Sequence, residues 1–270
     1  MITELDKDVY VFDLDGTVYI EDNPINGVSD VINLLRRQGK DVFFLSNNSS
    51  KSKQSYIDRL RSMDVNATDA EVILSTDSVI EYLNQRDIDV TYVVGTAEMR
   101  FELSNAGIDP VAENPTHVVV GFDRELTYEK LREASRHLTN GAGFIAAHPD
   151  RFCPTPEGPI PDCGSIVALL ETATGRSPDR VLGKPDPIML EPIYKRANCS
   201  PENTVMIGDR LETDIQMANA EGITSVCVLS GDATEDDIAT TTIRPDFVFD
   251  SATGLVADSD AVSNPQNFKP

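Results

Sequence analysis

The strongest signal for the fold is the segment Val9-Tyr10-Val11-Phe12-Asp13-Leu14-Asp15-Gly16-Thr17. Its first four residues are apolar and either β-branched or aromatic, which is typical of a strand buried on both faces of a parallel sheet. Two carboxylates and a glycine follow where that strand must end. Because ligands of open α/β sheets bind beyond the carboxyl ends of the strands, we expect a functional site at Asp13 and Asp15.

Similar short apolar segments recur along the chain and indicate further strands of the same sheet. They are Asp41–Ser46, 204–209 and 224–229. Helical patterns separate them, for example 27–38, which carries apolar residues on one side and meets a glycine at its end. This alternation predicts an α/β fold whose core is a Rossmann-like, doubly wound parallel sheet with helices on both faces.

A second α/β set in the middle of the chain predicts an inserted domain. Its expected strands are 90–94, 117–121 and 144–147, and its expected helices are 97–106, 128–138 and 165–174. The Pro and Gly residues of 175–187 mark the return to the first domain, where a strand at 180–182 and a helix at 187–195 are expected. We therefore predict core domain 1–77, an inserted α/β cap domain 78–179, and the rest of the core at 180–270.

The pair Asp13 and Asp15 suits chemistry at phosphorus. Residues two apart in a strand point the same way, but a turn that begins at Gly16 can splay them. One carboxylate can then attack phosphorus while the other serves the leaving-group oxygen as acid and the water as base. A helix cap, a turn or a Ca²⁺ loop is the alternative, although Leu14, Gly16 and Thr17 do not supply the alternating oxygen ligands of an EF-hand.

Two further polar motifs follow expected strands. The run Ser46-Asn47-Asn48-Ser49-Ser50-Lys51 offers a hydroxyl and backbone amides at a strand-to-helix turn, which favours phosphate binding. An N-cap cluster is the alternative for this run. Lys184, between Gly183 and Pro185, can neutralise a phosphate and crowded carboxylates as a point charge, and a surface lysine is its alternative.

Gly208-Asp209-Arg210-Leu211-Glu212-Thr213-Asp214 indicates part of a site for a hard cation. Its first carboxylate ends a strand, and another stands five residues later, where we expect the first turn of a helix. Mg²⁺ prefers few protein carboxylates together with phosphate oxygens and waters, which converging acids would provide. An N-cap Asp followed by ordinary first-turn acid is the alternative.

The order of these four motifs, each at a strand end, resembles the haloacid dehalogenase superfamily of phosphatases. The resemblance implies that Asp13 is the nucleophile, Asp15 the general acid and base, and Lys184 the third catalytic residue. It implies Mg²⁺ bound by Asp13, the backbone carbonyl of Asp15 and Asp209, with Asp214 supporting the metal from nearby. The residues it implies for binding the phosphate are Thr17, Ser46, Asn47, Asn48 and Lys184.

The spacing of the motifs and four longer strings narrow the resemblance to one branch. The stretch from Thr17 to Ser46 is too short for a cap domain, so the cap is of the second kind, inserted between Asn48 and Lys184. The strings SNNSSKS, GSIVALLETATGR, GKPDP and GDRLETDI closely resemble the NagD-like and 4-nitrophenylphosphatase branch, over nearly the whole chain. Relatives often have Asn in place of His148, and this departure leaves the substrate open.

We assign substrate choice to the cap loop from His148 to Cys153, because the core motifs need only a phosphate and Mg²⁺. Arg151 can pair with a carboxylate or a second phosphate, while Asp150 can fix the loop or accept a hydroxyl. A loop-stabilising ion pair or a solvent-facing Arg151 is the alternative.

The resemblance implies hydrolysis of a small phosphorylated metabolite, such as a sugar phosphate, phosphoglycolate or a nucleotide monophosphate, through an aspartyl-phosphate intermediate. 4-Nitrophenyl phosphate is the expected model substrate. A phosphomutase or phosphotransferase, and a non-catalytic sensor of phosphorylated ligands, are the alternatives.

The composition is strongly acidic, with 45 Asp and Glu against 23 Lys and Arg and a formal net charge of −22. Such a charge repels nucleic acids and anionic membranes, so neither is expected as a partner. A solvated surface explains the charge, and a halophilic protein of a high-salt cytosol is the sharper hypothesis.

The cysteines and the N-terminal segment carry the expectations about location and assembly. The four cysteines form no C-x-x-C pair, so we expect reduced thiols without a metal framework. The N-terminal sequence has no basic region followed by a long apolar run, and the cytoplasm is the expected compartment. The resemblance leaves open a homo-oligomer that pairs through the cap.

Overall fold

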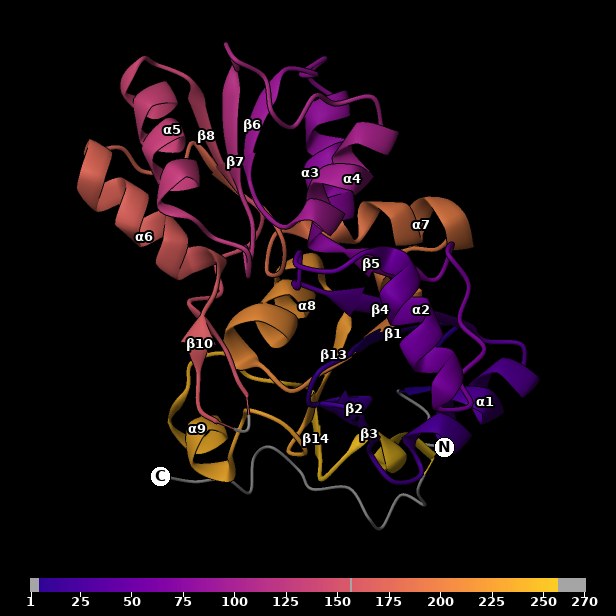
Figure 1. Cartoon of the computed structure of the whole chain (residues 1–270). Coiled ribbons are helices and arrows are strands. Elements are labelled where there is room, and N and C mark those ends of the chain that lie inside the picture. Colours follow the sequence, from indigo (N-terminus) through magenta and orange to yellow (C-terminus); the bar gives the residue numbers. More distant parts are fainter. Residues whose placement is uncertain (1–4, 156, 257–270) are drawn as a thin grey trace. The chain divides into compact units, whose positions relative to one another are not determined.

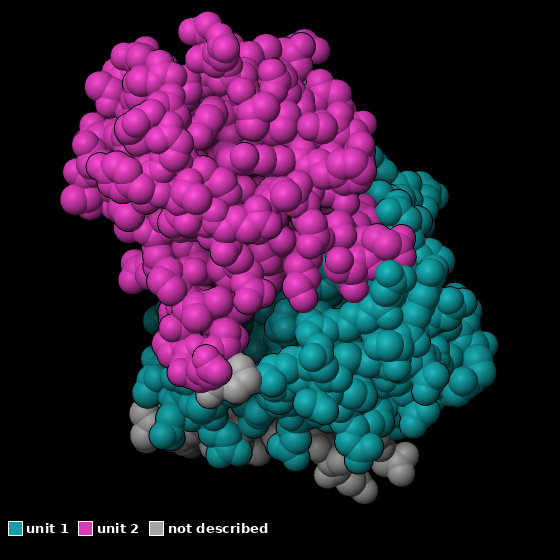
Figure 2. Space-filling model, viewed as in Figure 1, with its two compact units in different colours: residues 1–46, 56–73, 190–270 teal, residues 47–55, 74–189 magenta. Residues whose placement is uncertain are grey.

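The computed structural model describes residues 5–155 and 157–256 (Figure 1). They divide into two compact units (Figure 2). The core unit holds 5–46, 56–73 and 190–256, and the cap unit holds 47–55 and the described residues of 74–189. The domain boundaries expected near 77 and 179 stay a prediction, and the two ends of the expected core, 1–4 and 257–270, lie outside the described residues.

The core unit is built on a sheet of six strands within the described part of the chain. Their order across the sheet is β14 (Phe247–Phe249), β13 (Thr224–Val228), β12 (Thr204–Gly208), β1 (Val9–Asp13), β4 (Asp41–Ser46) and β5 (Val72–Leu74). The neighbours from β14 to β4 all pair in parallel. Strand β1 lies inside this sheet and is buried along its whole length, which explains its continuous apolar sequence.

Helices cover both faces of the core sheet. They are α1 (Val28–Arg37), α2 (Lys53–Ser62), α8 (Gln216–Glu221) and α9 (Glu235–Thr240). The chain steps one way across the sheet through α1 and α2 and the other way through α8 and α9, so right-handed crossovers place the two pairs on opposite faces (Figure 1). The doubly wound α/β fold predicted from the sequence is thereby confirmed.

The cap unit has a parallel sheet of its own. Its strands are, in order, β11 (Arg180–Val181), β8 (Gly143–Ala146), β7 (His117–Val120) and β6 (Thr91–Val94). Its helices are α3 (Ser75–Asn84), α4 (Ala97–Asn105), α5 (Tyr128–Thr139) and α6 (Cys163–Thr174).

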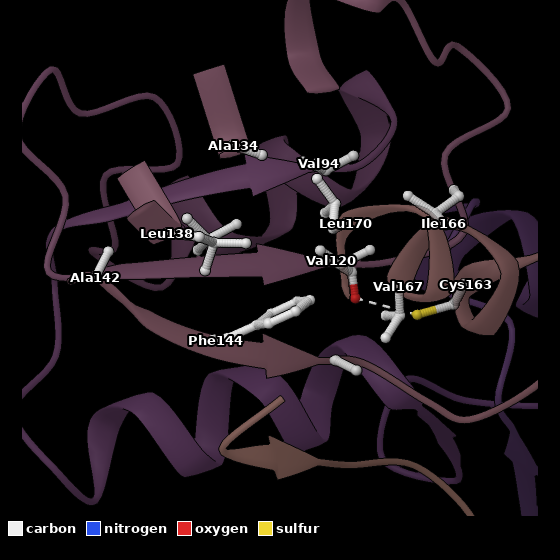
Figure 3. Packing of buried hydrophobic residues seen from close by; sticks show 12 residues of the cluster. Val94, Val120, Ala134, Leu138, Ala142, Phe144, Cys163, Ile166, Val167 and Leu170 are labelled. Atoms are coloured by element: carbon white, nitrogen blue, oxygen red, sulfur yellow. Dashed lines mark hydrogen bonds between the residues drawn. The ribbon is translucent and has the colours of Figure 1, made fainter. Parts of the chain in front are cut away.

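The cap unit also has its own hydrophobic core. Side chains of the three longer strands pack against α5 and α6, with Phe144, Leu138 and Leu170 fully buried among them (Figure 3). The Cys163 thiol donates to the Val120 carbonyl at 3.2 Å inside this core. The inserted domain expected from the sequence is therefore a separately packed α/β unit.

Three shorter stretches complete the description. Two hairpins pair β2 (Tyr19–Ile20) with β3 (Asn23–Pro24) and β9 (Phe152–Cys153) with β10 (Ile160–Pro161). The prediction of one helix over 187–195 is wrong in its bounds. The chain forms a 3₁₀ turn, Pro187–Met189, and then α7 (Glu191–Ala197). Pro192 lacks an N–H and is favoured in a first helical turn, so α7 begins just before it. Among the described residues no helix is long and apolar enough to cross a membrane.

Candidate active site

The register of the core sheet brings three of the expected site residues to one edge. Asp13 is the last residue of β1 and pairs with Leu45, so Ser46 ends the neighbouring strand β4 beside it. On the other side Phe12 pairs with Ile207, so Asp209 directly follows β12. Parallel strands end at the same edge, and the three polar residues therefore converge there.

A tight turn after β1 separates the two carboxylates of the first motif. The Leu14 carbonyl accepts the N–H groups of Thr17 at 3.2 Å and Val18 at 2.9 Å, and Gly16 has a φ of 88°. Asp13 is consequently buried, whereas Asp15 is exposed. The Thr17 hydroxyl is buried beside them and has no hydrogen-bond partner among the described residues.

Asp13, Asp209 and Asp214 form a buried cluster in which one carboxylate oxygen of each lies within 4.8 Å of the others. Burial raises the pKa of Asp209 well above its ordinary value, and the charges of Asp13 and Asp214 raise it further. The Asp209 Oδ2 accepts the N–H of Asp232 at 2.7 Å, while its Oδ1 is buried without a hydrogen-bond partner in the described chain. Three carboxylates and an unsatisfied oxygen fit a hard divalent cation.

Asp214 reaches the cluster from a π-helical turn, Leu211–Ile215, that leads into α8. The sequence predicted the first turn of an ordinary helix there; the observed turn is wider, a form often found at functional sites. The Asp214 Oδ2 accepts the backbone N–H of Arg210 at 3.1 Å. A side chain at Gly208 would lie 2.3 Å from the Asp214 Cγ, so glycine is required before Asp209.

The loop after β13 belongs to the same site, and the sequence reasoning missed it. A Cβ on Gly231 would lie 2.0 Å from the Asp209 Oδ2, and one on Gly16 would lie 2.3 Å from the same atom. The Ser230 hydroxyl donates to the Gly16 carbonyl at 2.7 Å. The signal was available, because Ser230-Gly231-Asp232 follows another strand of the same sheet edge.

In the cap unit the side chain of Asn47 holds the main chain of Lys184. The Asn47 Oδ1 accepts the Lys184 N–H at 2.6 Å, and its Nδ2 donates to the Lys184 carbonyl at 3.0 Å. The same Nδ2 lies 3.3 Å from both carboxylate oxygens of Asp150. Lys184 is 3% exposed, so the alternative interpretation of this residue as an ordinary surface lysine is wrong.

The other two expected cap residues have different surroundings. The Asn48 Oδ1 accepts the N–H of Ser50 at 2.9 Å and its hydroxyl at 2.7 Å, so this side chain shapes the turn. Arg151 is exposed and lines a cavity of about 340 Å³ that Ser165 and Glu171 also line.

The expected site residues are thus divided between the two compact units. The core unit holds Asp13, Asp15, Thr17, Ser46, Asp209 and Asp214. The cap unit holds Asn47, Asn48, Asp150, Arg151 and Lys184. The roles assigned to these residues in one reaction stay predictions.

A parallel sheet with a carboxylate cluster at its edge, and an α/β unit inserted after β5, the third strand of the core sheet along the chain, define a class of hydrolase. Residues 10–109 match the sequence profile of the haloacid dehalogenase-like hydrolases, and residues 181–255 match the HAD-hydrolase-like profile. The chain belongs to this family, in its NagD-like and 4-nitrophenylphosphatase branch, and is an enzyme of the phosphatase type.

Individual relatives cover nearly the whole chain. An acid sugar phosphatase of Staphylococcus aureus is 30% identical over 92% of this chain and 96% of its own length. The structure of a 4-nitrophenylphosphatase from Thermotoga maritima has a TM-score of 0.88 and 38% identity, covering 92% of this chain and 95% of that one. A magnesium complex of a glycerol phosphate phosphatase from Mycobacterium tuberculosis has a TM-score of 0.88 and 31% identity, covering 96% of this chain and 80% of that one.

Proposed function

We propose that this protein is a Mg²⁺-dependent phosphatase that hydrolyses small phosphate monoesters through a phospho-aspartate on Asp13. The observation that carries the proposal is the buried cluster of Asp13, Asp209 and Asp214 at the sheet edge, where the Asp209 Oδ1 has no hydrogen-bond partner among the described residues. A bound cation would offset the repulsion among these three buried carboxylates, and the Asp209 Oδ1 offers it a ligand oxygen.

The chain's own residues divide the first step between them. The Asp13 carboxylate attacks the phosphorus in line, and the bond from phosphorus to the leaving oxygen breaks. Asp15, in its protonated form, gives its proton to that oxygen as the alcohol departs. The exposed position of Asp15 supports this role, because the proton must reach a group outside the carboxylate cluster.

In the second step water attacks the phosphorus of the phospho-aspartate. Asp15 takes the proton of the water, the bond from phosphorus to Asp13 breaks, and inorganic phosphate leaves. Asp15 is then protonated again and Asp13 is a free carboxylate, so the enzyme returns to its starting state. The buried Thr17 hydroxyl and the Ser46 hydroxyl are proposed to hold the phosphate oxygens, and Lys184 is proposed to neutralise their charge.

Asp13, the Asp15 carbonyl and Asp209 would hold the metal, with Asp214 beside them. When bound, Mg²⁺ supplies positive charge that offsets the repulsion between these carboxylates and the phosphate. The named phosphatases among the relatives support a small polar substrate, such as a sugar phosphate or glycerol phosphate.

The decisive experiment measures phosphate release from a broad panel of phosphate monoesters, with Mg²⁺ or EDTA, in dilute and concentrated KCl. We expect turnover of 4-nitrophenyl phosphate and of at least one sugar or polyol phosphate, and its loss in EDTA. No release from any ester would contradict the proposal and favour a sensor of phosphorylated ligands.

The covalent step has a separate test. Acid-quenched Asp15→Asn protein, mixed with 4-nitrophenyl phosphate, should carry a phosphate on the peptide that contains Asp13, because its hydrolysis lacks a base. Mass spectrometry that finds only unmodified peptide would remove the phospho-aspartate from the mechanism.

A further inference from the structure

His148 lies fully buried in the cap unit, two residues beyond the end of β8, with a carboxylate near each ring nitrogen. Its Nδ1 is 3.5 Å from the Asp150 Oδ2, and its Nε2 is 3.6 Å from the Asp162 Oδ1. The Ser49 hydroxyl oxygen is 3.3 Å from Nε2. Asp162 is the N-cap of α6, so the ring connects that helix, the loop after β8 and the segment that follows Ser46.

The charge state of this ring is argued from the two carboxylates that face its nitrogens. A neutral imidazole carries only one N–H. With a carboxylate oxygen beside each ring nitrogen, the lone pair of the unprotonated nitrogen would face one of these oxygens and repel it. Only the imidazolium presents an N–H toward both Asp150 and Asp162, and at 3.5 and 3.6 Å these are charge contacts longer than hydrogen bonds. Two buried carboxylates without a cation between them would also repel each other in a region of low dielectric constant.

The other groups around the ring are consistent with a cation there. The Ser49 oxygen already accepts the Phe122 N–H at 2.8 Å and keeps a second lone pair for an Nε2–H donor. Burial raises the pKa of the Cys163 thiol to about 12, so this neighbour on α6 stays neutral. Arg151 and Glu171 line the same cavity as His148 and carry opposite charges.

The contacts of Asp150 extend this arrangement to the phosphate-binding motifs. Its carboxylate faces His148 on one side and the Asn47 Nδ2 on the other. Asn47 in turn holds both the N–H and the carbonyl of Lys184. A Cβ on Gly183, the residue before Lys184, would lie 2.6 Å from the His148 Cβ, so the two segments are also packed directly together.

We propose that His148 is a positioning residue that acts as a buried imidazolium: it holds Asp150 and Asp162 together and thereby fixes Asn47 and the main chain of Lys184. The inference rests on the phosphate-binding role that the proposed function gives to Lys184. Loss of the ring's proton at high pH releases Asp150 and loosens this arrangement, so turnover falls.

The first test reads the charge of the ring directly and does not depend on activity. The chain has three histidines, so NMR spectra of the imidazole C–H groups of the whole protein contain three titrating signals. His117→Gln and His137→Gln assign two of them, and burial lowers the pKa of both of those residues. We expect His148 to titrate at a higher pH than either.

Asp162→Asn is the informative variant for this test. Asn caps a helix as well as Asp does, so α6 keeps its N-cap while the negative charge is removed. We expect the titration midpoint of His148 to fall by about one pH unit or more. A ring that is neutral near pH 6.5, or a midpoint that Asp162→Asn leaves unchanged, would overturn the proposal.

The second test compares kcat/KM of Asp162→Asn and wild type on 4-nitrophenyl phosphate at two pH values. We expect a ratio near one at pH 6 and a loss of about tenfold at pH 8, with His148→Gln reduced at both. A purely structural role would lower the Asp162→Asn ratio equally at both pH values and would refute the positioning role. If the wild type hydrolyses no ester, the proposed function fails, while the NMR titration still decides the charge of His148.

Discussion

At the scale of single residues, burial separates the two aspartates of the first motif. Asp13 is 7% exposed and belongs to the carboxylate cluster, whereas Asp15 lies beyond the turn at Gly16 and faces solvent. This difference in burial supports the roles proposed for them, nucleophile for Asp13 and acid–base group for Asp15. A nucleophile gains from a fixed position beside the metal ligands, and an acid–base group gains from access to the leaving group and to water.

Asp13→Asn should abolish turnover while the protein remains folded. The amide has the same shape as the carboxylate but is a very poor nucleophile, so we expect less than about 1% of the wild-type rate. Phosphate release measures the rate, and circular dichroism checks the fold. Turnover above that level in metal-loaded protein would show that another group attacks the phosphorus.

The raised pKa of Asp209 makes metal-free protein sensitive to pH. A carboxyl whose pKa is raised in the folded state binds more protons there than in the unfolded chain, so stability falls as pH rises above the ordinary Asp value. Mg²⁺ bound at the cluster, as proposed, would oppose this loss by compensating the ionised carboxylates. The rise in melting temperature that Mg²⁺ produces should therefore be larger at about pH 8 than at about pH 5.

Asp209→Asn is the matched variant for that measurement. It should lose most of the Mg²⁺-dependent rise in melting temperature, and in EDTA at about pH 8 it should be more stable than the wild type because one repelling charge is gone. A Mg²⁺ effect that is equal at both pH values and survives in Asp209→Asn would place the metal elsewhere.

At the scale of elements, the loop after β13 restricts the position of Asp209. Gly231→Ala would push a methyl group into the Asp209 Oδ2, which the Asp232 N–H holds in place. We expect the Kd for Mg²⁺ to rise at least about tenfold, measured by calorimetry, because a displaced ligand binds poorly.

Gly254→Ala is the control for this change. Its Cβ would lie 2.4 Å from the Phe249 ring, so it should also lower the melting temperature, but it does not touch the carboxylate cluster. Equal losses of Mg²⁺ affinity in both variants would mean that general destabilisation, and not the position of Asp209, weakens binding.

The loop between β8 and β9 is the element to which we assign substrate choice. Asp150 is engaged with Asn47 and His148, which favours its loop-fixing role, while the exposed Arg151 remains the candidate for contacting substrate. Arg151→Ala should lower kcat/KM for a preferred anionic metabolite by about tenfold and leave 4-nitrophenyl phosphate nearly unchanged, because the latter offers no second charge to hold.

Arg132→Ala provides the comparison for the loop variant. Arg132 is exposed on α5 and pairs with Glu129 and Glu133, so its loss should affect neither substrate. Equal losses on both substrates in Arg151→Ala would mean that Arg151 supports the fold of the loop and does not select the substrate.

At the scale of the whole molecule, the net charge of −22 sets how stability responds to salt. Unscreened like charges repel one another in the folded state, and salt reduces this repulsion. We expect the melting temperature, measured in EDTA to exclude metal effects, to rise by about 5 °C or more between dilute buffer and about 2 M KCl. An unchanged melting temperature would remove the halophile hypothesis and leave the catalytic assignment intact.

Much of the fold could be predicted from the sequence because its signals are local. The apolar runs at β1 and β4 coincide with the observed strands, and the helical periodicity of 27–38 matches α1. Shorter or more polar elements gave weaker signals: α2 mixes charged and apolar residues, and β5 has three residues. The local sequence pattern does not predict α2 or β5 clearly, because packing against the rest of the unit stabilises these two elements.

The carboxylates of the candidate site could be predicted from the sequence alone, since Asp13, Asp209 and Asp214 lie in short motifs at strand ends and parallel strands end at a common edge. The contacts that support these residues became visible only in the folded chain. Asn47 meets Asp150 across 103 residues and Lys184 across 137, and His148 meets Asp162 on another element. Such contacts depend on how whole elements pack and on which side chains are buried together, and no local pattern of residues specifies them.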